Sequence, residues 1–457
     1  MKNLIKKYKQ ASSNDRNIIN NVTSAVVIKG ASLLLSLLTL PAYLRYFDNQ
    51  LALGLWFSVI SVLAWVLNFD LGIGNGLRNL LTHALTEGDK EKCKKLISSG
   101  YISLGIVVIA VTILFVLTYQ LFDWNFIFNI DTNIIRASVL ELSILIVFLG
   151  IMIQFFLRLI SSVLYAMQQS SINNFLSLCT ALIIFMFVSL APSGTTEHNL
   201  ILMAIVYCLA VTIPLLGANI IVFAFQLKEA RPSLKYFDSK SAKQVLSLGG
   251  IFFFVQIMYM VIMNSNEYLI TIFAGNEHVV TYQVYYKLFT AVGILFTLGL
   301  TPIWSAVTKA IAEKNHVWVQ KLYNKLIILC GVTCLLEFLL VPFIQPIINI
   351  WLGENSFTIQ YSHALLFAVL GCLMLLNGVF SSIANGAGEL KTQAVFFGIG
   401  AFAKIPIAWI LVLYFDSWIG VVIANIVALG IYCIVQPFWL KKYFREMEEK
   451  GNINVQE

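Results

Sequence analysis

Long runs of apolar residues alternate with short polar segments along the whole chain. A helix needs about 20 predominantly apolar residues to cross the hydrocarbon core of a bilayer. The runs are continuous in their apolar character, which is typical of membrane helices and not of membrane strands. The pattern therefore predicts an all-α integral membrane protein with about twelve transmembrane helices. The expected spans are residues 20–46, 52–72, 98–122, 137–166, 172–191, 200–226, 245–273, 279–306, 322–351, 360–384, 393–415 and 417–440.

Basic residues are distributed unevenly between the polar segments. Of the 30 Lys and Arg residues, 24 lie in segments that share one side of the membrane, while Arg45 and Arg136 lie on the other. Short cytoplasmic loops are enriched in Lys and Arg, so we expect both termini to be cytoplasmic. The first segment, 1–19, has no short apolar stretch with a small-residue cleavage site, so no removable signal peptide is expected.

A weak internal repeat divides the chain into halves. Segments 83–96 and 309–322 align without a gap, and each follows the second span of a set of six. Six spans per half give both halves the same orientation, so we expect two parallel-related six-helix lobes with the substrate bound between them. The predicted division is a cytoplasmic N-terminal segment 1–19, an N-lobe 20–226, a cytoplasmic linker 227–244, a C-lobe 245–440 and a cytoplasmic tail 441–457.

Composition excludes several classes of protein. The chain is 59% hydrophobic and 12% charged, which is incompatible with a water-soluble enzyme. A net charge of +7 over 457 residues is too low a density of positive charge for an ordinary nucleic-acid binder. The seven Cys and five His residues show no metal-ligand spacing, so we expect no metal and no cofactor. The longest outer loop, residues 123–136, is too short to enclose a catalytic site, which argues against a glycosyltransferase or polymerase.

Four cations fall inside predicted spans: Lys29, Arg158, Lys287 and Lys404. A charge at the centre of the bilayer costs at least about 2.5–3.5 kcal/mol on insertion scales, so each needs a compensating environment. Arg158 is close enough to the inner end of its helix to reach the interface. Lys404 is near the middle of its span, where escape to the interface is not expected.

Acidic residues at matching depth offer partners for two of these cations. Lys29 and Asp70 are predicted at nearly equal depth, and so are Glu267 and Lys287. Each pair could be a structural ion pair, since buried charges are usually paired. Alternatively, an anionic ligand could displace the acid, or protonation of the acid could free the cation.

Polar residues recur at helical spacing on several spans, which places them on one face. They either pack helices together through hydrogen bonds or line a hydrated cavity. Tyrosines near the outer ends are expected to form an interfacial belt or to stack on a glycan. The polar stripes include Gln154, Arg158, Ser161 and Tyr165; Gln256, Met260, Asn264, Glu267 and Thr271; and Gln283, Lys287, Thr290, Thr297 and Thr301; the tyrosines are Tyr43, Tyr282, Tyr285 and Tyr286.

Three short motifs resemble a known family. They are Gly54-Leu55-Trp56, the segment Asp70-Leu-Gly-Ile-Gly-Asn-Gly-Leu-Arg-Asn79, and Gly88-Asp89. The glycine-rich segment closes a membrane span and follows no strand, so it is not interpreted as a nucleotide-binding loop. Together with the topology, these residues resemble the polysaccharide transporters, the Wzx-type O-antigen flippases of the multidrug/oligosaccharidyl-lipid/polysaccharide exporter superfamily.

This resemblance implies a V-shaped exporter fold that opens alternately to each side of the bacterial inner (plasma) membrane. The implied activity is translocation of an undecaprenyl-diphosphate-linked oligosaccharide, such as an O-antigen repeat unit, from the cytoplasmic to the outer leaflet. The implied partners are this glycan lipid, membrane lipids and the polymerase and chain-length proteins of the same pathway. The runner-up is a proton- or sodium-coupled multidrug extruder of the same superfamily, which would depend on acidic residues.

Under the flippase interpretation, residues of two kinds have expected roles. Cations and amides bind the anionic diphosphate and the glycan, and acids couple transport to H⁺ or Na⁺. The predicted substrate-binding residues are Lys29, Lys287, Lys404, Arg158, Arg78, Gln283 and Asn264, and the predicted coupling residues are Asp70, Glu267 and Glu337.

Overall fold

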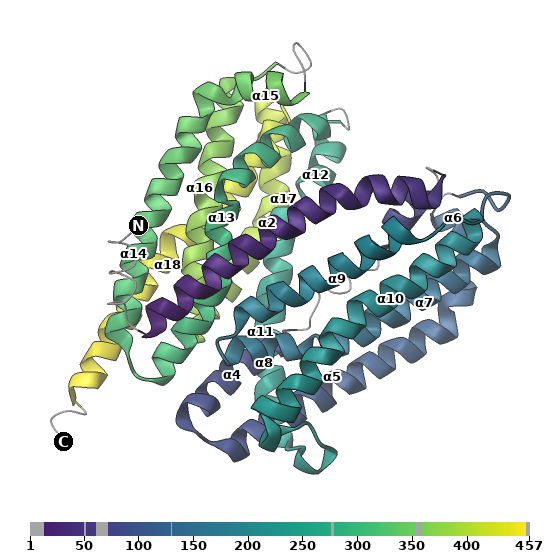
Figure 1. Cartoon of the computed structure of the whole chain (residues 1–457). Coiled ribbons are helices and arrows are strands. Elements are labelled where there is room, and N and C mark those ends of the chain that lie inside the picture. Colours follow the sequence, from purple (N-terminus) through teal and green to yellow (C-terminus); the bar gives the residue numbers. More distant parts are fainter. Residues whose placement is uncertain are drawn as a thin grey trace, which may run out of the picture. The chain divides into compact units, whose positions relative to one another are not determined.

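The computed structural model of the chain describes residues 13–49, 52–60, 72–128, 130–275, 278–352 and 358–453. Within these ranges the regular elements are all helical, and no strand is formed (Figure 1). The elements are α2 (Ser13–Phe47), a helix over 52–60, α4 (Ile73–Glu87), α5 (Lys90–Thr118), η1 (Tyr119–Leu121), α6 (Trp124–Ile127), α7 (Ala137–Leu157), α8 (Leu159–Ala166), α9 (Ser170–Leu190), α10 (Thr196–Ile221), η2 (Val222–Gln226), η3 (Lys228–Ala230), η4 (Leu234–Tyr236), α11 (Ser239–Asn264), α12 (Asn266–Phe273), α13 (His278–Ala312), α14 (His316–Leu340), η5 (Val341–Phe343), α15 (Ile344–Leu352), α16 (Tyr361–Ala387), α17 (Lys391–Phe415) and α18 (Ile419–Ile453).

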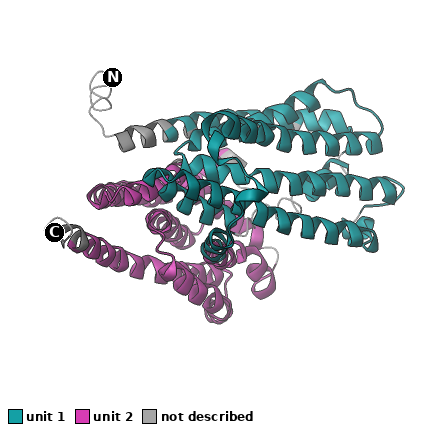
Figure 2. Ribbon diagram, turned by 90° about the horizontal axis from the view of Figure 1, so that it is seen from below, with its two compact units in different colours: residues 1–250 teal, residues 251–457 magenta. Residues whose placement is uncertain are grey.

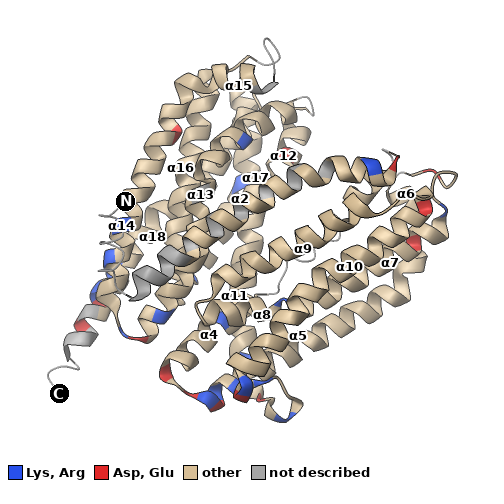
Figure 3. Ribbon diagram, viewed as in Figure 1, with Lys and Arg blue, Asp and Glu red and all other residues tan. Residues whose placement is uncertain are grey.

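Nine helices of the described ranges are long and apolar enough to cross a membrane, and a bent helix over 278–312 brings the number to ten. The first expected span falls on α2, and most of the second, 52–72, lies outside the described residues. Most of the charged residues lie near the ends of the helices, and a few lie within them (Figure 3). The prediction of an all-α membrane protein is confirmed.

The chain forms two compact units, residues 1–250 and 251–457 (Figure 2). In the first unit α2 packs on α9, α7 packs on α10, and α4 packs on α5 and α8. The segment expected as a linker, 227–244, is docked on the first unit. Ser99 Oγ on α5 accepts a hydrogen bond from Asp238 N at 3.0 Å and donates to Asp238 O at 3.1 Å. Helix α11 then begins in the first unit and continues into the second.

The glycine-rich motif makes a close crossing between α4 and α11. Gly72 precedes α4 with φ +66°, a conformation that glycine adopts without strain. A Cβ on Gly76 would lie 2.6 Å from the Val245 carbonyl oxygen, and one on Gly249 would lie 2.9 Å from the carbonyl group of Gly72. The motif therefore lets two helix backbones touch, as small residues do in membrane proteins.

Trp56 of the Gly54-Leu55-Trp56 motif is a core residue of the first unit. It is 1% exposed, stacks on Phe47 at a centroid distance of 6.4 Å and meets Tyr207 edge-on at 5.9 Å. Aromatic pairs of this kind add specific packing energy to apolar burial. The Trp in Gly-Leu-Trp therefore serves the fold directly.

In the second unit α17 packs on α18, and α16 contacts α13, α14 and α18. Its core contains Tyr282, Tyr285, Phe367 and Trp418. Both tyrosines are 1% exposed, so the expectation that they form an interfacial belt or stack on a glycan is wrong. Their hydroxyls are satisfied inside the unit: Tyr282 Oη accepts from Asn266 Nδ2 at 2.8 Å, and Tyr285 Oη accepts from the backbone N of Gln360 at 2.8 Å. Apolar neighbours with internal hydrogen bonds are the usual setting of a core tyrosine.

Candidate functional site

Helix α13 has one side that points away from the core of the second unit. Lys287, Thr297 and Thr301 are exposed on this side, together with the apolar Val280 and Ile294. The exposed faces of α14 and α17 are apolar, with Ile328 69% and Phe402 76% exposed. A cationic, hydroxyl-bearing face within a membrane span is expected to meet water or a ligand, because lipid tails cannot solvate it. The Lys287 face is therefore one candidate binding surface.

Glu267, in the first turn of α12, is held by an amide of α13. Gln283 Nε2 donates to Glu267 Oε1 at 2.5 Å. The possible ion pair between Glu267 and Lys287 is not formed: in the described part of the chain no carboxylate oxygen lies within 4.0 Å of the Lys287 ammonium. The break between α11 and α12 at Ser265 sets Glu267 opposite the turn before Lys287. Asn264, the last residue of α11, is exposed beside this break.

Lys404 of α17 is enclosed by the same helix break. Its side chain is fully buried. The ammonium donates to the carbonyl oxygen of Ile262, to Ser265 Oγ at 2.9 Å and to Asn266 Oδ1 at 2.7 Å. Carbonyl groups in the last turn of a helix lack intrahelical donors, and a cation there also complements the helix dipole. Lys404 was expected to bind substrate, but its ammonium instead stabilises the break between α11 and α12. Sequence reasoning did not anticipate this role.

Of three further predicted residues, the structure describes the side chain of one, Glu337. Glu337 of α14 is 1% exposed, and its Oε2 has no hydrogen-bond partner among the described residues. Asp70 and the side chain of Lys29 lie outside the described residues, so their pairing stays a prediction. Across the ranges that the structure describes, no group of three or more His, Cys, Asp or Glu side chains is arranged to hold a metal ion.

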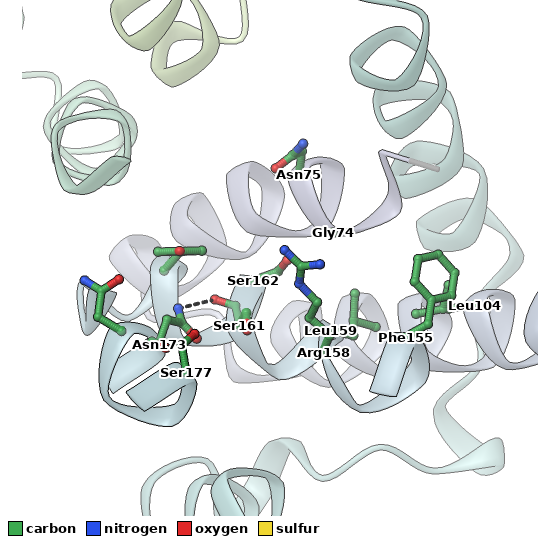
Figure 4. A pocket seen from close by; sticks show the side chains of 12 residues that line it. Gly74, Asn75, Leu104, Phe155, Arg158, Leu159, Ser161, Ser162, Asn173 and Ser177 are labelled. Atoms are coloured by element: carbon green, nitrogen blue, oxygen red, sulfur yellow. Dashed lines mark hydrogen bonds between the residues drawn. The ribbon is translucent and has the colours of Figure 1, made fainter. Parts of the chain in front are cut away.

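The first unit contains a polar pocket beside Arg158 (Figure 4). Its volume is about 230 Å³. Arg158 stands at the junction of α7 and α8, where the helix is interrupted, and its guanidinium points into the pocket toward α4. Serines and asparagines of α8 and α9 supply hydroxyl and amide groups around it. The lining residues are Gly74, Asn75, Leu104, Phe155, Arg158, Leu159, Ser161, Ser162, Tyr165, Asn173, Asn174 and Ser177.

The pocket has a defined wall on the α9 side. Asn173 Nδ2 donates to the Ser161 carbonyl oxygen at 3.2 Å and ties the start of α9 to α8. A second cavity of about 130 Å³ continues from it past Gln154 and Thr180. The stripe with Gln154, Arg158 and Ser161 indicated one wall from the sequence. The spacing of Asn173, Ser177 and Thr180 was the signal for the opposite wall, and it was missed.

Arg78 of α4 lies behind the same pocket. It is 2% exposed, and its guanidinium carbon is 4.6 Å from the centre of the Tyr165 ring. A cation over an aromatic face is attracted by the quadrupole of the ring. Arg78 was predicted to bind substrate, but its guanidinium is buried against Tyr165 and is not open to a ligand. Through Tyr165 it is connected to the pocket that Arg158 lines.

No family model matches the chain. A protein of Yersinia pseudotuberculosis, named for a suggested role in O-antigen export, is 19% identical over 402 residues, which are 86% of this chain and 88% of the relative. A solved MATE structure in the bent conformation has a TM-score of 0.74 at 16% identity, covering 96% of this chain and 98% of that one. An outward-facing multidrug resistance MATE family transporter of the MOP superfamily has a TM-score of 0.69 at 17% identity, covering 96% and 97%.

The protein is thus a multi-pass helical membrane protein with a transporter fold. The fold is that of the MATE transporters of the MOP superfamily, the multidrug/oligosaccharidyl-lipid/polysaccharide exporters. The chain therefore shares its fold with structures of the superfamily to which the sequence motifs pointed, and the expected helical architecture is confirmed.

Proposed function

We propose that the protein is a flippase that moves an undecaprenyl-diphosphate-linked oligosaccharide, an O-antigen or similar repeat unit, from the cytoplasmic to the outer leaflet by alternating access. One observation carries the proposal: each unit presents a cation within a polar surface inside its spans, Arg158 in the pocket of the first and Lys287 on the α13 face of the second. The relative named for O-antigen export adds support.

The chemistry of this cargo matches those surfaces. A diphosphate carries negative charge that cannot cross a lipid core without compensation. Arg158 and Lys287 would supply the compensating charge, with Lys29 as a further predicted contributor. The glycan needs hydroxyl and amide partners, which Asn173 and Ser177 offer in the first unit and Gln283 and Asn264 in the second. Lys404 is left out of this set because its ammonium is already fully bonded.

The proposal includes a location and partners. The excess of basic residues on one side supports a bacterial inner (plasma) membrane protein with both termini in the cytoplasm. A glycan flippase supplies its product to enzymes of the outer face, so the polymerase and chain-length proteins of the same pathway are the proposed partners. Translocation itself breaks no covalent bond and requires no cofactor beyond a coupling ion.

The second candidate function is a proton- or sodium-coupled multidrug extruder. Its support is the likeness to MATE structures, together with Glu267, a half-buried carboxylate beside the exposed face of α13. A carboxylate in that position attracts organic cations by the same Coulomb interaction with which it would attract the Lys287 ammonium. The two candidates differ in which charge is essential for transport.

A transport assay distinguishes the flippase from the extruder. It uses reconstituted vesicles with the lipid-linked oligosaccharide in one leaflet. Flippase activity predicts that Lys287→Ala and Arg158→Ala abolish leaflet-specific appearance of the glycan, while Lys287→Arg restores at least part of it. Lys309→Ala is the matched control, because Lys309 lies at the end of the same helix and pairs with Glu313 at 3.6 Å. Full activity of both alanine variants would reject the flippase, and drug efflux that is lost with Glu267→Gln alone would favour the extruder.

A further inference from the structure

The end of the first unit where α4 meets α5 combines exposed apolar side chains with charge. Basic and acidic residues gather around the lower end of α5 (Figure 3). Three candidate membrane spans begin or end in this region: Lys90–Leu121, Thr196–Gln226 and Ser239–Asn264. In the segment that joins the last two, residues 227–238, Leu234 is 81% exposed and Phe237 is 46% exposed. Apolar side chains beside the ends of spans are expected to enter the membrane interface, because this removes their surface from water.

Basic residues outnumber acidic residues on this surface. Segments 84–95 and 226–243 contain nine Lys and Arg residues against five Asp and Glu residues. Three of the five acids form ion pairs, with Lys90, Lys92 and Lys95. In the described part of the chain, no carboxylate oxygen lies within 4.0 Å of the ammonium of Lys228 or Lys235. A surplus of basic charge directly beside membrane spans attracts anionic headgroups.

A cavity of about 410 Å³ opens between the α4–α5 turn and the η2–η3 segment. Lys90 and Lys228 line it, and the Lys90 ammonium lies 3.0 Å from Glu229 Oε2. Both side chains of this ion pair are more than half exposed, so the pair contributes little free energy and can rearrange around a ligand. The other walls are mainly apolar, formed by Ala84, Leu85, Cys93, Leu227 and Ala230.

This lining suits a phospholipid better than a glycan. A phosphate group accepts charge-assisted hydrogen bonds from lysine ammonium groups, and an acyl chain gains free energy against apolar walls. A glycan needs many polar partners, yet Gln226 is the only lining residue with a side-chain amide, and none has a hydroxyl. Glu229 also lines the cavity and limits how much negative charge it accepts. A phosphodiester with a single negative charge therefore fits better than a diphosphate.

We propose that this end of the first unit binds an anionic phospholipid of the cytoplasmic leaflet. Its phosphate lies at Lys90 and Lys228, and an acyl chain runs along the apolar walls of the cavity. Leu234 and Phe237 enter the same leaflet and anchor segment 227–238 to the membrane. The inference goes beyond the proposed function and holds whichever cargo the protein carries. It uses only the orientation that the distribution of basic residues indicates.

Competition between two phospholipids of equal chain length tests the site. The full-length protein in detergent is titrated with phosphatidylglycerol or phosphatidylcholine, and bound lipid is counted by native mass spectrometry. The wild-type protein should prefer phosphatidylglycerol. A lysine near a membrane surface changes the affinity for an anionic lipid about fivefold. The double variant Lys90→Gln, Lys228→Gln should therefore bind phosphatidylglycerol about 30-fold more weakly and phosphatidylcholine as before.

Two controls separate this site from a general effect of charge. Glu229→Gln breaks the same ion pair as Lys90→Gln, but it removes a negative charge, so it should strengthen phosphatidylglycerol binding. Lys442→Gln makes the same change of charge on α18 in the second unit, where Lys442 pairs with Glu446 at 3.7 Å, and it should leave the affinity unchanged. Weaker binding in Glu229→Gln, or an equal loss in Lys442→Gln, overturns a site at Lys90 and Lys228.

A second measurement follows the exposed apolar side chains. Amide hydrogen exchange of residues 231–238 should be slower in nanodiscs that contain phosphatidylglycerol than in nanodiscs of phosphatidylcholine alone. The double variant Leu234→Ser, Phe237→Ser should lose this difference, and a difference that persists overturns the anchoring role.

Three results distinguish the phospholipid site from the proposed function. Equal binding of the two phospholipids by the wild-type protein overturns the site. Binding of the lipid-linked oligosaccharide in preference to phosphatidylglycerol, with dependence on Lys90 and Lys228, assigns the cavity to the cargo and also overturns it. Absence of glycan translocation together with the expected lipid preference rejects the flippase and supports the phospholipid site, because binding is measured without transport.

Discussion

Arg78 lies with its guanidinium carbon 4.6 Å above the ring of Tyr165, joining α4 to α8 behind the pocket that Arg158 lines. Both partners are inside the first unit, and Arg78 is almost completely buried. A desolvated cation–π contact contributes about 2 kcal/mol. The pair therefore fixes one wall of the pocket.

Substitution of Tyr165 tests this contact. Tyr165→Phe keeps the aromatic face and should retain stability, whereas Tyr165→Ala should lower the thermal unfolding temperature of the detergent-purified protein by removing the attraction and apolar packing. Translocation should fall in the alanine variant, because the wall loses its support. Equal unfolding temperatures for the Phe and Ala variants would show that the contact contributes nothing.

The crossing of α4 and α11 gives a second prediction. Gly76→Ala places a Cβ 2.6 Å from the Val245 carbonyl oxygen, and a backbone atom cannot rotate away, so we expect a loss of about 1–3 kcal/mol of stability. Gly250→Ala is the control, because a Cβ there meets nothing within 4 Å and alanine favours a helix over glycine by about 1 kcal/mol. Thermal unfolding should rank Gly76→Ala below wild type and Gly250→Ala at or above it. The reverse order would contradict the close crossing.

Much of the architecture was accessible from the sequence because lipid imposes a simple rule. Backbone groups in hydrocarbon must bond internally, so apolar runs of sufficient length become helices. The interruptions at Ser265 and at Arg158 were not anticipated. Hydropathy reports only how much a residue prefers lipid, and both breaks depend on tertiary partners, such as the Lys404 ammonium that satisfies the end of α11.

The site was predicted less completely, for a related reason. Helical spacing placed Lys287, Thr297 and Thr301 on one side of a helix, and all three are exposed there, since this inference requires only the periodicity of one helix. Estimates of depth placed Glu267 near Lys287, but depth does not resolve one helical turn, and Gln283 is the actual partner. Arg78 was predicted to bind substrate, and its burial could not be foreseen because the ring that covers it lies 87 residues further along the chain.

The start of α11 should respond to acid. Asp238 Oδ2 accepts from Ser241 N and Ser241 Oγ, each at 2.7 Å, and these bonds hold the pKa of Asp238 below its usual range. A depressed folded-state pKa gives stability that is present above the unfolded value and is lost as pH falls through the folded value. The amides of residues 239–242 should therefore lose protection from hydrogen exchange, relative to an unfolded chain at the same pH, below about pH 4. Asp238→Asn should remove that pH dependence, and unchanged exchange in this variant would contradict the assignment.

Lys404 distinguishes a structural lysine from a substrate-binding one. Lys404→Ala leaves the Ile262 carbonyl, Ser265 and Asn266 without their donor, and each buried unsatisfied group costs about 1–3 kcal/mol. We expect a marked fall in unfolding temperature. Lys404→Arg should not restore it, since the site encloses the ammonium completely. Lys287→Ala, on an exposed face, is the matched control and should lose translocation with its unfolding temperature unchanged. A Lys404→Ala protein as stable as wild type but inactive would return Lys404 to the substrate-binding set.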